Sequence, residues 1–377
     1  MQDASIVESG NIRGKKSAVT GRDDSQTYKP GAMFTLPFVS VVMPVRNEVD
    51  FVQISLGAVL MQEYPEDKLE IVVADGMSTD GTREWLDRIS STTKNLRVVD
   101  NPGQIVATGL NRAIAVSKGD IVVRVDGHCK VARDYVKRCV DHILQDRVDG
   151  VGGSIRTIGD SPVARAIAVA MSSRFGVGGS AFRIASGKTM LADTVPFPAY
   201  TREIIEKAGA YDEELVRNQD DEYNYRLRKL GARILLAGDI ATDYYSRTDL
   251  KHLWKQYYEY GYWKVRVLRK HPRQMSLRQF APPGLVGAIA SSLILTAAFS
   301  GVAFIFGTIV GLYISAVIIA TLLKIREIGI SSLPYLFAAY AILHFSYGTG
   351  FIVGLVKWVS SPGLSNHAAT QREFKSL

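Results

Sequence analysis

Two alternating patterns run from about residue 38 to residue 125. Segments with apolar residues at helical spacing, such as Val52, Leu56 and Val59, separate short runs rich in β-branched residues. The short runs lie at 38–44, 69–75, 96–99 and 121–125. Strands that alternate with helices of this length form right-handed β-α-β units and a mostly parallel sheet covered by helices on both faces. The pattern predicts an α/β fold.

The apolar pattern becomes continuous near the C-terminus. No charged residue occurs in 284–323, which is long enough for two spans of roughly 20 residues each. We expect spans at about 284–303 and 305–323, with a tight turn near Ser300-Gly301 or Phe306-Gly307. A third apolar segment, 331–356, holds Pro334, His344, Gly348 and Gly350, so the pattern leaves open whether this segment also crosses the bilayer.

Positive charges flank the uncharged stretch on both sides. Arg273 and Arg278 precede it, and Lys324 and Arg326 follow it. Because Lys and Arg accumulate on the cytoplasmic side of a membrane, both ends of the pair are expected there. The sequence therefore predicts a multi-pass protein of the inner (plasma) membrane whose α/β domain is cytoplasmic.

The segment between the two regions mixes aromatic residues with cations. Trp254, Tyr257, Tyr258 and Trp263 stand among lysines and arginines in 250–270. Two interpretations stay open: a helix that lies along the lipid headgroups, or an amphipathic helix packed on the α/β domain. The predicted order of domains is a disordered tail (1–35), an α/β domain (36–248, with halves at about 38–130 and 131–248), the helix region (249–280), a membrane domain (281–358) and a polar tail (359–377).

Composition and charge limit which kinds of partner the sequence predicts. The chain is 47% hydrophobic and carries a net charge of +8, but its lysines and arginines are not interleaved with aromatics as in a nucleic-acid-binding module. Much of the excess lies beside the apolar C-terminal segments, so lipids of the inner leaflet are the expected anionic surface. Two cysteines, Cys129 and Cys139, indicate a reducing compartment and no disulfide framework. A zinc site that adds His128 and His142 is disfavoured, because adjacent side chains of a strand point to opposite faces.

Polar residues follow three of the predicted strands. They are Arg46-Asn47-Glu48, the segment 75–82, and Asp126 with His128. Ligands of such sheets bind where the strands end, so these clusters predict one site. Spacing of two puts Asp126 and His128 on one side of an extended backbone, where they could hold a divalent cation that bridges to a diphosphate. The alternative is that Asp126-Gly127 is simply a hairpin turn.

These clusters, in order, carry a family resemblance. Pro44-Val-Arg46-Asn47-Glu48, Ala74-Asp75-Gly76 to Thr82, and Val125-Asp126-Gly127-His128 resemble the successive nucleotide-sugar motifs of family 2 glycosyltransferases. The segments 193–194, 199–213 and 218–226 are similar to the acceptor half of that family. The resemblance covers roughly 38–270 and is closest to succinoglycan-type exopolysaccharide glucosyltransferases. It implies the GT-A nucleotide-diphospho-sugar transferase fold, a mostly parallel Rossmann-like sheet, followed by transmembrane helices.

The resemblance also implies roles on the donor side. Asp75 would receive the base or ribose, Asp126 would meet the metal and the diphosphate, and Glu48 and Asp80 would frame the pocket. Pro44, Arg46 and Asn47 belong to the same nucleotide-sugar motif. His128 stands where the family has a second aspartate, and an imidazole suits Mn²⁺ better than Mg²⁺. The alternatives are a strand-end cap for Asp75 and a helix N-cap for Asp80.

The acceptor side needs a general base. The resemblance places it at Asp220, with Asp221 in reserve because Gln219 replaces the family's glutamate. Asp193, Arg202, Gln219 and Arg226 are assigned by the same motifs to the acceptor region. An acidic first turn is also ordinary helix chemistry.

The combined prediction is an inverting glycosyltransferase that moves a hexose, glucose from UDP-glucose, to a polyprenyl-diphosphate-linked saccharide in exopolysaccharide or cell-envelope polysaccharide biosynthesis. Other polysaccharide-assembly proteins are further expected partners. Two alternatives remain: a processive polysaccharide synthase and a non-catalytic nucleotide-binding membrane protein. Processive synthases carry Gln-x-x-Arg-Trp, whereas Gln256 is followed by Tyr257-Tyr258-Glu259-Tyr260, which disfavours the first alternative.

Overall fold

The structure is a computed structural model that describes residues 35–184, 187–245 and 249–360. The chain divides into two units, Met1–Leu36 and Pro37–Leu377, and the second holds nearly all of the described residues. The predicted tails at 1–35 and 359–377 lie almost wholly outside these residues.

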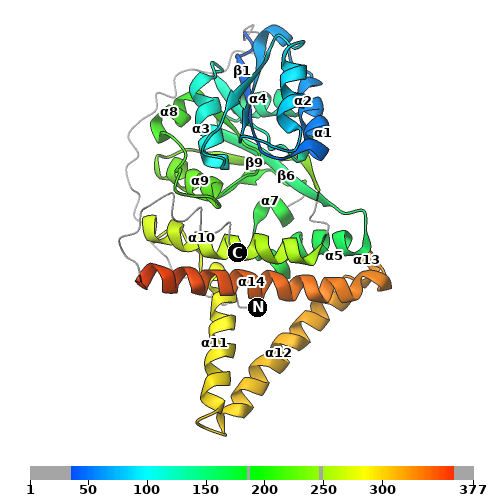
Figure 1. Cartoon of the computed structure of the whole chain (residues 1–377), viewed down its shortest axis with the longest axis vertical. Helices are drawn as coiled ribbons and strands as arrows, with labels where there is room; N and C mark the ends of the chain where they lie inside the picture. Colours follow the sequence, from blue (N-terminus) through cyan, green and yellow to red (C-terminus); the bar gives the residue numbers. More distant parts are fainter. Residues whose placement is uncertain (1–34, 185–186, 246–248, 361–377) are drawn as a thin grey trace, which may run out of the picture. The chain divides into compact units, whose positions relative to one another are not determined.

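The four predicted strands and three intervening helices are all present. The strands are parallel neighbours in the order β3-β2-β1-β4, and Figure 1 shows them in the blue and cyan part of the unit. The bounds are β1 (Val39–Val45), α1 (Val49–Leu60), β2 (Leu69–Asp75), α2 (Thr82–Ser90), β3 (Leu96–Asp100), α3 (Val106–Val116) and β4 (Ile121–Arg124), with a short 3₁₀ helix η1 (Glu66–Lys68) before β2.

The sheet continues beyond β4 as a mixed sheet of order β3-β2-β1-β4-β8-β6-β9-β5, with β7 paired to β9. β8 runs antiparallel to β4, whereas β6 and β9 are parallel to each other. The additional elements are β5 (Cys129–Val131), α4 (Tyr135–Gln145), β6 (Gly150–Ile158), α5 (Pro162–Met171), α6 (Arg174–Val177), α7 (Ala181–Ile184), β7 (Met190–Leu191), β8 (Ala199–Thr201), α8 (Arg202–Ala208), α9 (Gln219–Lys229) and β9 (Ile234–Tyr245).

Alternation along the strands builds two cores, one on each face of the sheet. β1 is buried along its whole length; Val41 and Met43 join one cluster, whereas Val42 joins the other. Val52 and Leu56 of α1 are fully buried against the first cluster, and Leu110 of α3 against the second. The period-2 and period-3.6 patterns of the sequence thus become the two sides of one sheet.

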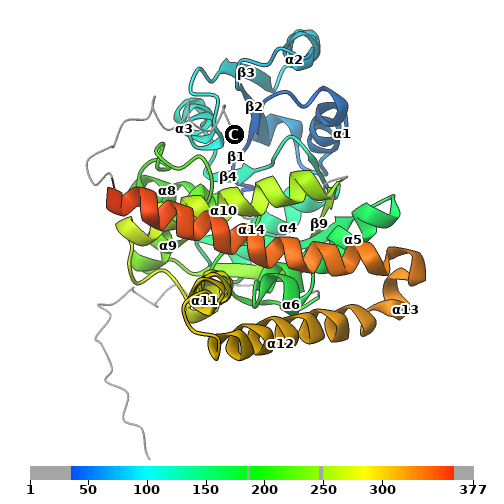
Figure 2. The same ribbon diagram turned by 60° about the horizontal axis from the view of Figure 1, so that its bottom comes forward.

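Two long helices, α10 (Leu250–Lys270) and α14 (Leu333–Ser360), pack side by side beneath the sheet, as Figures 1 and 2 show. Of the two interpretations of 250–270, packing is observed: Tyr257, Trp263 and Lys264 are buried. Glycines allow the close crossing, because a Cβ atom at Gly350 would clash with the Tyr258 carbonyl oxygen. α14 is continuous because its proline, Pro334, lies in the first turn, where proline is tolerated.

Two apolar helices project from this layer as a hairpin (Figure 1). They are α11 (Ala281–Thr296) and α12 (Val302–Leu322), preceded by the 3₁₀ helix η2 (Leu277–Phe280) and followed by α13 (Ile325–Ile328) and η3 (Ile330–Ser332). The first helix ends before the predicted residue 303, because the turn occupies 297–301. By length and composition, 277–296, 302–322 and 330–360 are all candidate membrane spans. In Figure 1 the third of these, α14, lies across the direction of α11.

Candidate active site

The loops after β1 and β2 hold each other through reciprocal hydrogen bonds. The Asn47 backbone N–H donates to Ser78 Oγ (2.9 Å), and Thr79 N–H donates to Asn47 Oδ1 (2.9 Å). Asn47 has φ 51°, a left-handed conformation that asparagine tolerates better than most residues. Arg46 reaches across to the Gln104 carbonyl oxygen (3.4 Å). The polar cluster after the first strand therefore meets the cluster after the second, as their positions predicted.

Asp80 joins two helix starts at this edge. Its Oδ1 accepts from Thr82 N–H (3.0 Å) and Thr82 Oγ1 (2.6 Å), and its Oδ2 accepts from Val49 N–H (3.1 Å). Desolvation opposes ionisation, but these hydrogen bonds outweigh it and lower the pKa of Asp80. In this structure Asp80 has the capping contacts of the structural alternative, at the first turns of α1 and α2.

Asp75 is the buried carboxylate at the end of β2. Its side chain is 1% exposed, accepts from Ser78 Oγ (2.6 Å) and Ser78 N–H (3.2 Å), and lies 3.5 Å from Arg83 Nη1. Pro44, two residues before Arg46, is buried inside β1. The structure thus brings Pro44, Arg46, Asn47, Glu48, Asp75 and Asp80 to one edge of the sheet.

The Asp-x-His segment lies in a turn, not in an extended strand. β4 ends at Arg124, and β5 begins at Cys129 and pairs with β9. The hairpin alternative is therefore wrong as well, because the strands on either side of Asp126-Gly127 do not pair with each other. A Cβ atom at Gly127 would lie 3.3 Å from Glu48 Cγ, so this glycine allows the close approach of the loop after β1.

Each side chain of the segment has one specific partner. Arg124 donates from Nε and Nη2 to the two oxygens of Asp126 (2.8 and 3.0 Å). Desolvation would raise the pKa of Asp126, but the charge and hydrogen bonds of Arg124 lower it. His128 Nδ1 lies 3.0 Å from Glu48 Oε1. A carboxylate that accepts from Nδ1 leaves Nε2 as the metal-binding nitrogen, the usual arrangement of a histidine ligand.

Within residues 35–184, 187–245 and 249–360, no three His, Cys, Asp or Glu side chains are grouped closely enough to hold a metal ion. Asp126 and His128 offer one oxygen and one nitrogen ligand, and the orientation of His128 by Glu48 suits ligation. This donor set fits a cation whose remaining ligands are diphosphate oxygens and water. The zinc alternative has no geometric basis: Cys129 and Cys139 are buried, burial raises the pKa of both thiols, and His142 contacts Asp146 and Asp239.

Asp220 and Asp221 differ sharply although both begin α9. Asp221 forms an ion pair with Lys264 of α10, which is 3% exposed. Asp220 has no ion pair with any residue in the described part of the chain, and its Oδ1 accepts only from the Asp221 backbone N–H (2.9 Å). Desolvation, opposed by Arg124 and reinforced by the charge of Asp221, raises the pKa of Asp220. A partly buried, unpaired carboxylate of raised pKa has the properties of a general base.

A cavity of about 780 Å³ joins the two ends of the site. Its lining includes Asp126 and His128 on one side, Asp220 and Gln219 of α9, and residues of α10, α11, α12 and α14. The side-chain oxygen of Gln219 is buried without a hydrogen-bond partner in the described structure. Asp193 also lines the cavity and pairs with Arg228 (3.1 Å).

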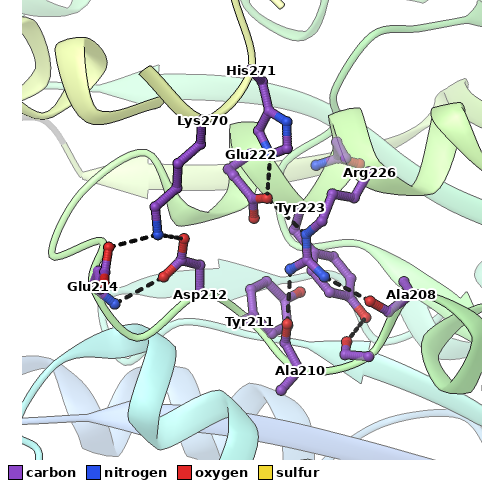
Figure 3. A network of polar contacts seen from close by, with 12 residues as sticks. Ala208, Ala210, Tyr211, Asp212, Glu214, Glu222, Tyr223, Arg226, Lys270 and His271 are labelled. Carbon is purple, nitrogen blue, oxygen red and sulfur yellow. Dashed lines mark hydrogen bonds and ion pairs between the residues drawn. The ribbon is translucent and has the colours of Figure 1, made fainter. Parts of the chain in front are cut away.

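Arg226 and Arg202 are not in the cavity lining. Figure 3 shows that Arg226 holds α9 in place: it donates to Glu222 Oε1 (2.7 Å) and to the carbonyl oxygens of Ala208 and Ala210 (2.6 and 2.8 Å). Glu222 Oε1 also lies 2.9 Å from His271 Nε2 at the end of α10. Arg202 donates to the carbonyl oxygens of Ser117 and Gly119, before β4 begins. The assignment of both to the acceptor region stays a prediction; in this structure Arg226 positions the helix, and Arg202 lies beside the start of β4.

Sequence reasoning missed the cations that surround the site. Arg124 interrupts an apolar run, and a charged residue inside a buried strand is a visible signal that it has a specific partner. Lys264, Arg174, Arg183 and Arg278 also line the cavity. No local pattern distinguishes them from ordinary surface cations, because their common location arises from tertiary packing.

Comparisons with known proteins identify the family of this chain. A model of glycosyl transferase family 2 matches residues 40–209. The succinoglycan biosynthesis protein ExoA of Rhizobium meliloti is 33% identical over 64% of this chain and 73% of its own length. A dolichyl N-acetyl-alpha-D-glucosaminyl phosphate 3-beta-D-2,3-diacetamido-2,3-dideoxy-beta-D-glucuronosyltransferase of Methanococcus voltae is 28% identical over 85% of this chain and 98% of its own.

A solved structure shares the fold. The mannosyltransferase PcManGT from Pyrobaculum calidifontis, solved with GDP-Man and Mn²⁺, superposes with a TM-score of 0.56 at 21% identity. The match covers 82% of this chain and 87% of the mannosyltransferase. At this identity the likeness shows the fold and no more.

Proposed function

The chain belongs to glycosyltransferase family 2 and has the GT-A fold, and we propose a specific reaction for it. It is a glycosyltransferase of polysaccharide biosynthesis. The proposed reaction is the transfer of a hexose, with inversion, to a lipid-linked saccharide. The proposed donor is UDP-glucose, and the proposed acceptor is a polyprenyl-diphosphate-linked saccharide at the inner leaflet. The observation that carries this proposal is the shared cavity. It brings Asp126 and His128, the unpaired carboxylate of Asp220, and the apolar helices into one space.

Asp220 is the proposed general base. Its carboxylate takes the proton of the acceptor hydroxyl as that oxygen bonds to the anomeric carbon, while the bond from that carbon to the diphosphate oxygen breaks. The nucleoside diphosphate leaves with the bonding electron pair. Attack from the face opposite the leaving group inverts the anomeric centre. Asp221 remains the reserve candidate, although its ion pair with Lys264 makes it less available.

The donor occupies the edge formed by β1, β2 and β4. Asp75 receives the base or ribose, and Pro44, Arg46, Asn47, Glu48 and Asp80 shape the pocket around it. Asp126 and His128 would hold a divalent cation, with Mn²⁺ preferred because of the imidazole ligand. When bound there, such a cation would supply positive charge to stabilise the leaving diphosphate. The mannosyltransferase structure with GDP-Man and Mn²⁺ is consistent with this assignment.

The apolar helices support the proposal of a lipid-linked acceptor. The Methanococcus relative is named for transfer to a dolichyl-linked sugar phosphate, and the cavity of this chain reaches Leu285, Tyr313 and Leu343 of the apolar helices. Asp193 and Gln219 line the same cavity and would contact the acceptor saccharide.

The proposed location is the inner membrane, with the α/β domain cytoplasmic and α11 and α12 crossing as a hairpin. A reporter fused after Arg326 should therefore be active in the cytoplasm. A periplasmic signal there would contradict a hairpin, because one crossing would then separate Arg278 from Arg326.

The decisive experiment incubates the full chain in membranes with a panel of radiolabelled nucleotide sugars and extracts the lipid fraction. Label from one UDP-hexose should enter a lipid-linked product by a single addition, and the anomeric configuration of that product should be opposite to the donor's. A polymer would favour the processive alternative. No transfer from any donor, with UDP binding intact, would favour the non-catalytic alternative.

A further inference from the structure

The cations around the cavity divide into two groups. Arg124, Arg217, Arg228 and Lys264 each form an ion pair, with Asp126, Glu259, Asp193 and Asp221 respectively. Arg174, Arg183 and Arg278 line the same cavity but pair with no carboxylate in the described part of the chain. Arg183 Nη1 is in addition buried without a hydrogen-bond partner there. A buried guanidinium nitrogen without a partner is costly, so an anionic ligand would complete this group.

Two of the three unpaired arginines belong to elements that pack on the apolar helices, and the third, Arg183, lies in α7, which packs on β6. Arg174 begins α6, which packs on α14, and Arg278 lies in η2, which packs on α11. Arg183 lies in α7, which follows α6 after a short loop that contains Gly178 and Gly179. Two segments of the chain about a hundred residues apart therefore supply the three arginines to one cavity.

The loop between α6 and α7 leaves room for the guanidinium of Arg278. A Cβ atom at Gly179 would clash with Arg278 Nη1, and one at Gly178 would lie 3.6 Å from Arg278 Cδ. Because these positions are glycines, Arg278 can reach the segment that joins α6 to α7. Arg278 is therefore held beside the connection between the two helices that carry Arg174 and Arg183.

The cavity wall is apolar and aromatic near helices α11, α12 and α14. Leu285 of α11, Tyr313 of α12, and Leu343 and Tyr347 of α14 line it there. A cationic zone thus adjoins an apolar, aromatic wall on one side, and the same cavity contains Asp220. A ligand that fits this arrangement has an anionic centre, an apolar chain on one side and a hydroxyl-bearing group on the other.

We propose that Arg174, Arg183 and Arg278 form the binding site for the diphosphate of a polyprenyl-linked acceptor, with the first isoprene units against Leu285 and Leu343. Guanidinium groups bind phosphate oxygens with paired, charge-assisted hydrogen bonds. This inference rests on the proposed lipid-linked acceptor. It adds which residues hold the acceptor and thereby orient its sugar toward Asp220.

The test measures binding to the full chain in nanodiscs of neutral lipid. The probes are farnesyl diphosphate, inorganic diphosphate, farnesol, and UDP with Mn²⁺. Farnesyl diphosphate should bind roughly tenfold or more tightly than inorganic diphosphate or farnesol, because it uses both the cationic zone and the apolar wall. Arg174→Ala and Arg278→Ala should each weaken farnesyl diphosphate binding by about tenfold and leave UDP affinity unchanged.

Matched controls are Arg165→Ala and Arg273→Ala, since both arginines are exposed and neither lines the cavity. Arg174 and Arg278 are exposed as well, so their variants should fold, and an unchanged melting temperature checks that they do. Arg183→Lys keeps the charge but loses the planar fork, and it should weaken farnesyl diphosphate binding more than either control.

Two results would overturn the proposal. Equal affinity for farnesyl diphosphate and inorganic diphosphate would mean that the apolar wall is not used. A parallel loss of UDP affinity in Arg174→Ala and Arg278→Ala would assign these cations to the donor. The proposed function fails separately, if the wild-type chain binds farnesyl diphosphate as expected but transfers no sugar to any lipid fraction.

Discussion

The proposed donor edge, at the loops after β1 and β2, and the cationic zone of the cavity differ in how their polar groups are satisfied. At the donor edge, Asn47, Ser78 and Asp80 bond to one another or to nearby backbone N–H groups. In the cationic zone, Arg174 and Arg278 pair with no carboxylate in the part of the chain that the structure describes, and Arg183 has a buried nitrogen without a partner there.

This difference indicates two ways of preparing a binding site. A loop whose hydrogen bonds are made within the protein is preorganised, so a ligand meets a nearly fixed surface. A group of unpaired cations is stabilised by the ligand itself, because like charges repel until an anion arrives. Asp220 resembles the second kind of group, because it is a carboxylate without an ion pair among the described residues.

The largest effect is expected at Asp220. Asp220→Asn should reduce the transfer rate by about 10²–10⁴-fold, or roughly 3–5 kcal/mol of barrier, because it removes the general base. UDP affinity should survive, since the donor edge does not depend on this residue. Transfer rate and UDP binding, measured on the same preparation, check the separation.

Asp221→Asn is the matched control for that experiment. It leaves the buried Lys264 without its partner, so it should lower stability more than turnover of the folded protein. An inactive Asp221→Asn beside an active Asp220→Asn would shift the base by one residue. Full activity in both would make the start of α9 structural.

Asp126→Asn should produce the next largest effect, on the donor side. The change weakens a metal ligand and removes the charge that pairs with Arg124, so Mn²⁺-dependent UDP affinity should fall by about tenfold or more. Asp193→Asn is the control, because it changes another carboxylate of the cavity. Calorimetry of UDP binding with Mn²⁺ and with a chelator measures both. Unchanged Mn²⁺ dependence in Asp126→Asn would refute the metal assignment.

Asp80→Ala tests whether the donor edge depends on internal hydrogen bonds. Loss of the contacts to Thr82 and Val49 should cost about 1 kcal/mol of stability and lower the melting temperature by a few degrees. The exposed Asp50 of α1 provides the control variant, Asp50→Ala. If UDP affinity falls while the melting temperature holds, Asp80 contacts the nucleotide and is not mainly a cap.

The smallest effect is a shift in the pH profile. Asp220 must be deprotonated to act, and desolvation raises its pKa, so activity should be lost on the acid side at a higher pH than the usual pKa of an aspartate. Arg124 opposes the raised pKa, whereas Asp221 and Asp126 reinforce it. Asp221→Asn should therefore move the acid limb of kcat/KM to lower pH. A limb that stays in place or moves upward would mean that another group controls it.

The alternation of apolar and polar positions was sufficient to predict β1 to β4, the helices between them and the two helices of the hairpin. These elements depend on neighbours in sequence, as do the hydrogen bonds from Thr82 to Asp80. The motifs also carried enough information to predict that the polar clusters after β1 and β2 meet, because parallel strands end at one edge of a sheet.

Tertiary structure decided the rest, because the deciding partners are far apart in the chain. Arg202 and Arg226 resembled acceptor residues, yet both bind backbone carbonyl oxygens of distant segments. The apolar segment of α14 is a candidate span by length and composition, and only the fold shows that its glycines pack against α10. Asp220 and Asp221 are adjacent in the sequence as first and reserve candidates for the base, and only the approach of Lys264 from α10 pairs one and leaves the other unpaired. Charge and hydropathy are properties of single residues, but pairing and burial depend on what the fold brings beside them.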